Sequence, residues 1–190
     1  MDGERAESVY FSSTGPSCTE ETLYAAKRRA EQLGIKSIVV ASTTGETGRR
    51  ASELFKGYNL VVVTHVYGFK GPDTQELTEE NRKQIVDNGA KILTTTHAFG
   101  GVGRAIRRKF QTMQVDEVIA NTLRIFGEGM KVACEIAAMA IDSGLVRSDE
   151  DLISIGGSSR GSDTAIVARP ANVSSFFDFK VKEVISKPRL

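Results

Sequence analysis

The sequence predicts an α/β fold with three layers, α/β/α, built on a mostly parallel sheet with antiparallel strands near the C-terminus. Short apolar runs alternate with longer segments of helical periodicity, which is typical of a parallel sheet covered by helices on both faces. The run at residues 60–65 is apolar on both faces, as expected for a strand deep in such a sheet. At 190 residues the chain has a suitable length for one domain, and we expect a single domain over residues 1–190.

The first half of the chain consists of repeated strand and helix units. Ser17 and Glu20 have capping-box spacing ahead of the first expected helix, and Gly34 is placed to end that helix. Gly57 and Gly89 are stop signals after the next two helices. The expected strands cover residues 9–12, 35–41, 60–65 and 91–95. The first expected helix follows Ser17 and ends at Gly34, the second follows the loop at 42–48 and runs to about 55, and the third covers 78–87.

The second half begins with glycines at 100–103 and a short basic helix. A long helical segment then covers residues 115–143, and Gly127 and Gly129 predict a break or bend within it. Strands are expected at 152–155 and 164–169, joined by a glycine-rich hairpin. A last strand at 179–185 is expected at an edge of the sheet.

The most informative segment is residues 38–51, where a buried strand runs into a loop of small residues and then a helix. Free backbone N–H groups, hydroxyls and the positive end of the helix dipole would bind an anion there, and a phosphate fits best. Arg49 or Arg50 would supply positive charge. In the alternative interpretation, Thr44 or Thr47 only caps the helix and the glycines relieve crowding. The residues predicted to hold the phosphate are Ser42, Thr43, Thr44, Gly45, Thr47, Gly48 and Arg49.

Small, hydroxyl, aromatic and basic residues follow each of the other expected strands. Ligands of open parallel sheets bind beyond the carboxyl ends of the strands, so these residues are candidates for the same site. The two histidines would act as acid or base or donate hydrogen bonds, and the aromatic rings would stack on a planar ligand. Alternatively, the histidines tie loops to backbone carbonyls and the rings cover the end of the core. These candidates are Ser13, His65, Tyr67, Gly68, Phe69, His97, Phe99, Gly157, Ser158 and Arg160.

Lys131 and Glu135 lie four residues apart on an apolar helix. A carboxylate there must be paired or solvated, so we expect an ion pair in preference to a catalytic carboxylate.

Several classes of function are disfavoured by composition. The formal net charge of +1 argues against a nucleic-acid binder, and no run of 18 apolar residues indicates a membrane span. The two cysteines lie far apart, the histidines have no partners at ligand spacing, and no metal site is expected. The N-terminus carries no apolar targeting segment, so we expect a cytoplasmic protein. A homo-oligomer contact at Phe176, Phe177 and Phe179 and burial of these rings in their own domain are equally open.

Two stretches support a family resemblance. Residues 38–49, and residues 153–157 with 160–165, resemble the C-terminal allosteric domain of pyruvate kinase, where a Ser/Thr-Gly loop and a glycine-rich hairpin hold a sugar bisphosphate. The chain is also similar, over nearly its full length, to a family of stand-alone archaeal and bacterial proteins with that fold. The segments that carry this similarity are 19–23, 126–132, 142–144, 169–171 and 176–178.

The resemblance implies a three-layer fold and a bound flavin mononucleotide (FMN) or similar phosphorylated ligand, with its phosphate on residues 42–49. The barrel domain that performs phosphoryl transfer in pyruvate kinase is missing, so the resemblance does not imply that activity.

The expected function is therefore binding of a phosphorylated heteroaromatic ligand, FMN, at the carboxyl edge of the sheet. The ring would lie toward Tyr67, His97 and Phe99, and FMN would carry any chemistry. A non-catalytic module that senses a sugar phosphate or nucleotide is an alternative. A nicotinamide-dependent oxidoreductase is the weakest alternative, because Ile106 occupies the third glycine position of the dinucleotide fingerprint after Gly101 and Gly103. Whether the protein is an enzyme stays open.

Overall fold

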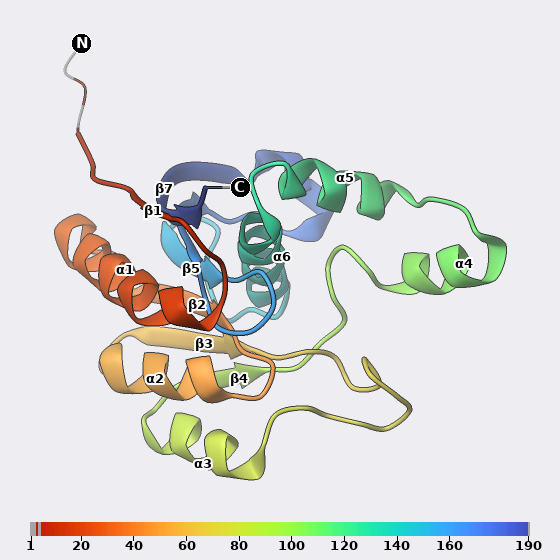
Figure 1. Ribbon diagram of the computed structural model, residues 1–190, viewed down its shortest axis with the longest axis horizontal. Helices are drawn as coiled ribbons and strands as arrows, with labels where there is room; N and C mark the ends of the chain where they lie inside the picture. The colour runs from red at the N-terminus through yellow and green to blue at the C-terminus, as the bar shows by residue number, and fades with distance from the viewer. Residues whose placement is uncertain (1–2, 4, 190) are drawn as a thin grey trace.

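The computed structural model describes residues 3 and 5–189, which form a seven-stranded sheet in the order β1-β7-β6-β5-β2-β3-β4 (Figure 1). β6 is antiparallel to both of its neighbours, and the other pairings are parallel. The strands are β1 (Val9–Phe11), β2 (Ser37–Ala41), β3 (Asn59–Val63), β4 (Lys91–Leu93), β5 (Leu152–Gly156), β6 (Thr164–Arg169) and β7 (Lys180–Pro188).

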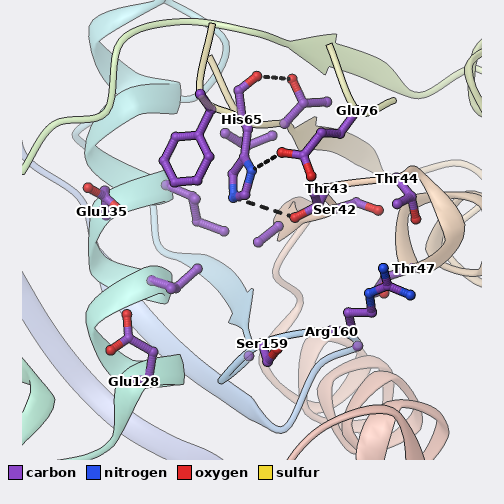
Figure 2. Close-up of a pocket in the computed structure, with 18 of the residues that line it drawn as sticks. Ser42, Thr43, Thr44, Thr47, His65, Glu76, Glu128, Glu135, Ser159 and Arg160 are labelled. Atoms are coloured by element: carbon purple, nitrogen blue, oxygen red, sulfur yellow. Dashed lines mark hydrogen bonds and ion pairs between the residues drawn. The ribbon is translucent and has the colours of Figure 1, made fainter. Parts of the chain in front are cut away.

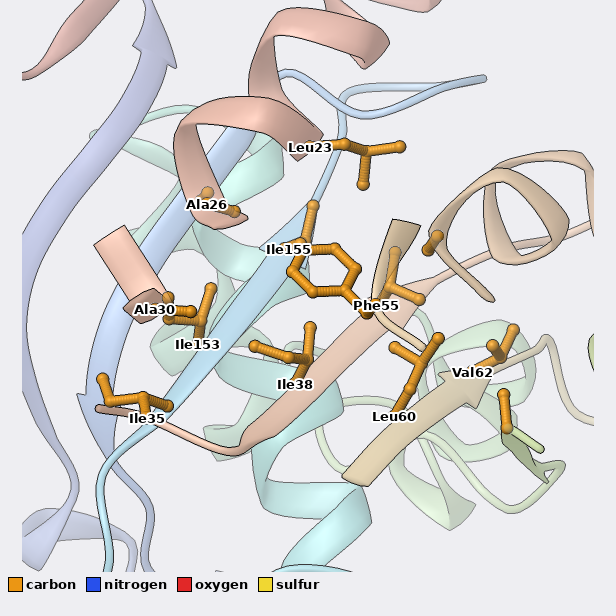
Figure 3. Close-up of a cluster of buried hydrophobic side chains, with 14 of the residues drawn as sticks. Leu23, Ala26, Ala30, Ile35, Ile38, Phe55, Leu60, Val62, Ile153 and Ile155 are labelled. Atoms are coloured by element: carbon orange, nitrogen blue, oxygen red, sulfur yellow. The ribbon is translucent and has the colours of Figure 1, made fainter. Parts of the chain in front are cut away.

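Helices cover both faces of the sheet, which confirms the predicted three-layer fold. Side chains of α1, α2 and α3 pack in one apolar cluster on one face, and side chains of α5 and α6 pack in a second cluster on the other face. Figure 3 shows Leu23, Ala26 and Ala30 of α1 lying against Ile153 and Ile155 of β5. The α-helices are α1 (Thr19–Leu33), α2 (Glu46–Leu54), α3 (Glu79–Asp87), α4 (Val102–Phe110), α5 (Val115–Arg124) and α6 (Glu128–Asp142), and the 3-10 helices are η1 (Pro16–Cys18) and η2 (Val173–Asp178).

β2 shows why the central strands are apolar without interruption. Ile38 and Val40 belong to the cluster on one face and Val39 to the cluster on the other, and all three side chains are fully buried. Burial of each side chain stabilises the fold by about 1.5–3 kcal/mol relative to exposure. The chain direction of β2 therefore fixes where its polar continuation, the loop at residues 42–48, leaves the sheet.

Two sequence-based expectations for the termini were wrong. The capping box of Ser17 and Glu20 does not form, because η1 precedes α1 and the N-cap residue, Cys18, makes no side-chain cap hydrogen bond. β7 is also not an edge strand, since it lies between β1 and β6. The short strand β1 pairs with β7, with Val9 opposite Ser186, and takes the edge position itself.

The expected break in the long helical segment is confirmed, with α5 ending at Arg124 and α6 starting at Glu128. Gly127 precedes α6 with φ of 115°, a conformation that residues with a Cβ rarely adopt.

The helix α4 lies away from the sheet and contains no buried residue (Figure 1). Large apolar side chains, including Phe110 and Ile125, are exposed in the α4–α5 region. Of the aromatic group considered as an oligomer contact, Phe176 and Phe179 pack against the α6 side of the core, and only Phe177 is exposed. Self-association stays a prediction. No helix in the described part of the chain is both long and apolar enough to span a bilayer.

Candidate functional site

A cavity of about 570 Å³ lies at the carboxyl edge of the sheet. Its walls come from the loops that follow β2, β3, β4 and β5, and from one side of α6 (Figure 2). The side chains of Val132, Ile136 and Met139 on α6 line the cavity with apolar surface. The position agrees with the expectation that the strand ends of an open parallel sheet converge on one site.

The anion loop (residues 42–48) is held by one hydrogen bond within the loop and by two hydrogen bonds to the start of α3. The buried Ser42 Oγ accepts a hydrogen bond from the Gly48 N–H at 2.9 Å. The Thr44 carbonyl accepts from the Thr78 N–H at 3.2 Å and from Asn81 Nδ2 at 3.0 Å. The N–H groups of residues 43–47 find no acceptor within the described residues. These consecutive donors are therefore available to a ligand.

The glycines of the loop are required by close packing. Gly45 has φ of 95°, and a Cβ there would lie 2.5 Å from atoms of Asn81 and Leu77. A Cβ on Gly48 would lie 2.5 Å from Val62 Cγ1. The alternative interpretation is therefore correct in that the glycines relieve crowding. The other part is not, because the N-cap of α2 is Gly45, and the Gly48 N–H is accepted by the Ser42 hydroxyl and not by Thr44 or Thr47.

The charge beside the loop comes from residues other than Arg49. Arg49 forms an ion pair with Glu53 at 2.8 Å and does not line the cavity, whereas its neighbour Arg50 does. Arg160, from the glycine-rich hairpin between β5 and β6, also lines the cavity and extends toward Thr47 in Figure 2. Within the described residues Arg160 has no hydrogen bond or ion pair, so its five donors are free for an anion.

His65 connects the anion loop to a partly buried carboxylate. Its Nδ1 lies 2.7 Å from Glu76 Oε2, and its Nε2 lies 3.5 Å from Thr43 Oγ1 (Figure 2). Glu76 also pairs with Lys70 at 2.8 Å. Burial raises the pKa of Glu76, but the hydrogen bonds from Lys70 and His65 outweigh it and leave that pKa below its usual value. The carboxylate is therefore ionised at neutral pH and holds the imidazole in place.

His97 is a neutral imidazole next to an aromatic stack. Burial lowers its pKa to about 4, and the nearby charge of Glu135 only partly offsets that effect. The ring stacks on Phe69 with centroids 5.2 Å apart and planes at 17°. The guanidinium of Arg104 lies 4.9 Å from the Phe69 ring centroid. This arrangement presents flat aromatic and cationic groups to the cavity.

The expected ion pair on α6 is confirmed. Lys131 Nζ pairs with Glu135 Oε2, and both side chains are buried. The second oxygen, Oε1, accepts the Phe99 N–H at 3.1 Å. Both carboxylate oxygens therefore have partners, which offsets the cost of burying the charge.

About half of the predicted site residues line the cavity. Tyr67 points out of it with 59% of its surface exposed, and Phe99 is buried in the core against Phe176. The lining residues among those predicted are Ser42, Thr43, Thr44, Thr47, His65, Phe69, His97, Gly157 and Arg160. The predicted residues outside the lining are Ser13, Gly45, Gly48, Arg49, Tyr67, Gly68, Phe99 and Ser158.

Sequence reasoning missed Glu76 and Arg104. Glu76 belongs to the loop between β3 and α3, and no spacing rule connects it with a histidine eleven positions earlier. Arg104 belongs to the short basic helix, whose sequence gives no signal of a site, but its guanidinium lies over Phe69 and lines the cavity. In the described part of the chain, no group of three or more His, Cys, Asp or Glu side chains is arranged to hold a metal ion.

The family described as "Pyruvate kinase, alpha/beta domain" matches residues 20–168. A pyruvate kinase from Cryptosporidium parvum is 16% identical with a TM-score of 0.43, and the alignment covers 81% of this chain and 23% of that one. A second structure of Cryptosporidium parvum pyruvate kinase is 15% identical with a TM-score of 0.40, covering 80% and 22%.

An O-ureido-L-serine-bound mutant of O-ureido-L-serine synthase is 19% identical with a TM-score of 0.32, covering 70% of this chain and 50% of that chain. This chain spans less than a quarter of the length of the pyruvate kinases it matches. The match to the family covers most of the sequence, including the anion loop and the β5–β6 hairpin. The chain therefore belongs to the pyruvate kinase alpha/beta domain family.

Proposed function

We propose that the cavity binds a small phosphorylated heteroaromatic ligand, FMN, with its phosphate on the anion loop and its ring toward Phe69 and His97. The supporting observation is the run of N–H groups at residues 43–47 that lack acceptors in the described chain, at the start of α2 and beside Arg160. Backbone donors at a helix N-terminus and an unpaired guanidinium are the groups that bind phosphate in proteins.

The charge balance of the cavity supports an anionic ligand. Its lining contains four acidic side chains, and each of them pairs with a basic side chain of the same lining. Two lining cations, Arg104 and Arg160, have no ion-pair partner among the described residues. A phosphate would compensate this excess of positive charge.

The remainder of the lining fits a planar ring. Phe69 and His97 offer aromatic surface, and the apolar side of α6 offers a wall for a ring to pack against. Neutral His97 adds a hydrogen-bonding group without a charge. When bound, FMN would supply electron-transfer chemistry, and these residues would orient the ring and exclude water.

The test is a fluorescence titration read immediately after mixing, with FMN, riboflavin and a sugar phosphate as separate ligands. Binding of FMN with much weaker binding of riboflavin supports the proposal, because only the phosphate distinguishes them. Binding of a sugar phosphate, measured by calorimetry, in a protein that does not bind FMN would replace the proposal with the sensing alternative. Equal affinity for FMN and riboflavin would contradict the phosphate site.

A further inference from the structure

We propose that Thr43, His65 and Glu76 form a catalytic relay and that the cavity hydrolyses small phosphomonoesters through a phosphorylated Thr43. The inference rests on the proposed phosphate site and adds a reaction to it. It is carried by the contacts of the His65 imidazole, which lies against a carboxylate on one side and the Thr43 hydroxyl of the anion loop on the other.

The hydrogen bonds assign a role to each nitrogen of His65. Because Glu76 accepts at 2.7 Å, Nδ1 carries the proton and Nε2 has a free lone pair in the neutral ring. The Nε2 atom faces Thr43 Oγ1 at 3.5 Å, which is within the looser range found before a substrate binds. The order hydroxyl, imidazole, carboxylate is the arrangement of an activated nucleophile, its base and the group that orients the base.

The orientation of His65 is fixed by more than one contact. Gln75 Nε2 donates to the His65 carbonyl at 2.9 Å, and the Phe69 ring lies 4.1 Å from the imidazole centroid. The side chain of Glu76 is itself held by Lys70. The charged and titratable groups around the imidazole are therefore Glu76, Lys70 and, 5.5 Å away, the ring of His97. These contacts hold the His65 ring in one orientation, as a base that transfers a proton requires.

The nucleophile lies where a phosphate would be bound. Thr43 lines the cavity and is the first residue of the run of free N–H groups, so a phosphate on that run would lie next to its hydroxyl. The N–H groups and Arg160 would stabilise the negative charge on the phosphoryl oxygens in the transition state.

The reaction has two balanced steps. Thr43 Oγ1 bonds to phosphorus as its proton passes to His65 Nε2; the bond from phosphorus to the ester oxygen breaks, and the leaving alcohol takes that proton. A water molecule then attacks the phosphothreonine and gives a proton to His65. His65 returns the proton to Thr43 Oγ1 as the oxygen–phosphorus bond breaks, which releases inorganic phosphate. Glu76 stays ionised throughout and is a positioning residue.

The experiment uses the full chain with p-nitrophenyl phosphate, whose aryl ring suits the aromatic side of the cavity. Release of p-nitrophenol gives the rate, and mass spectrometry of acid-quenched protein detects phosphate on the peptide that contains Thr43. Thr43→Val and His65→Gln are expected to lower the rate about a hundredfold or more, and Thr43→Ser to retain a large part of it. Thr112→Val, at an exposed threonine outside the cavity, is the matched control and should leave the rate unchanged.

The Glu76→Gln variant tests whether Glu76 orients the His65 base or only stabilises the loop that contains it. We expect a lower kcat with a KM for p-nitrophenyl phosphate close to that of the wild type, because the variant disturbs the base and leaves the phosphate-binding N–H groups in place. Glu76→Asp, which keeps the carboxylate, should recover part of the rate. A variant that only loosened the anion loop would raise KM as well, and a raised KM with an unchanged kcat would remove Glu76 from the relay.

FMN binding is measured on the same proteins, so the two proposals fail separately. FMN that binds without becoming riboflavin, together with no release of p-nitrophenol, overturns the relay and leaves the FMN site standing. Release of p-nitrophenol without FMN binding overturns the FMN assignment alone. Wild-type turnover that persists undiminished in Thr43→Val, or a wild-type protein without phosphate on the Thr43 peptide, contradicts the relay even if other variants fail to fold.

Discussion

The two imidazoles of the cavity differ because of what surrounds them. His65 has a carboxylate partner at 2.7 Å. His97 is mostly buried among an aromatic ring and groups of both signs, and its pKa of about 4 keeps it neutral at physiological pH. Among the described residues, only His65 therefore has a carboxylate hydrogen-bonded to its ring.

The low pKa of His97 predicts an acid-dependent loss of stability. The unfolded chain binds a proton at this side chain near pH 6.5, but the folded protein does so only near pH 4. The stability contributed by the neutral buried ring is thus present above pH 6.5 and is lost as the pH falls through 4, by up to roughly 3 kcal/mol. Urea unfolding between pH 4 and 7 measures this slope. His97→Gln should flatten it, and a slope that is unchanged in the variant would contradict the assignment.

The free guanidinium of Arg160 predicts a specific effect of charge on ligand binding. Arg160→Glu should weaken FMN binding by about tenfold or more, because a charge-assisted contact to phosphate is replaced by repulsion. Arg49→Glu is the matched control on α2, where the arginine instead pairs with Glu53. Fluorescence titration of both variants gives the comparison. Equal losses in the two variants would indicate a general charge effect and not a site at Arg160.

At the level of elements, the close packing of α2 on β3 predicts the effect of a single methyl group. Gly48→Ala should lower the free energy of unfolding by about 1–3 kcal/mol, because the new Cβ would overlap Val62 Cγ1. The double variant with Val62→Ala removes the overlapping atom, so the two changes should be non-additive in a double-mutant cycle of urea unfolding. Additive losses would show that the contact between α2 and β3 is not the constraint.

The strands were predictable where burial is continuous on both faces, as in β2 and β3. The β5–β6 hairpin was also predictable, because its glycine-rich turn separates two strongly apolar runs. The placement of β7 was not, since its alternating pattern does not encode that β1, a strand of three residues, would cover its outer side. The capping box before α1 was not predictable as absent from local spacing, because the segment forms η1 and the Thr19 hydroxyl accepts the Ser162 N–H, a contact between residues 143 positions apart.

At the level of the whole molecule, the two apolar clusters share one sheet. β2 contributes side chains to both clusters, so unfolding of the helices on one face would also disturb the cluster on the opposite face. We therefore expect a single cooperative unfolding transition, as is usual for one domain of this size. Far-UV circular dichroism and tyrosine fluorescence should give coincident urea curves, with tyrosine the reporter because the chain has no tryptophan. Two separated transitions would contradict the single domain.

The sequence located the site better than it identified the contacts within it. The rule that ligands bind beyond the carboxyl ends of parallel strands placed His65, His97 and the anion loop together. Arg50 lines the cavity in place of Arg49 because the two residues point to different sides of α2, and Tyr67 is exposed because of the conformation of the loop after β3. Glu76 and Arg104 join the site through tertiary contacts that leave no local pattern.

The availability of the N–H groups at residues 43–47 is the basis of the proposed phosphate site, and amide NMR tests it most directly. In ¹H–¹⁵N spectra of the full chain titrated with inorganic phosphate, the account predicts that the largest shifts fall on the amides of residues 43–47 and on the side chain of Arg160. Phosphate shifts that cluster elsewhere, with these amides unmoved at saturation, would contradict it.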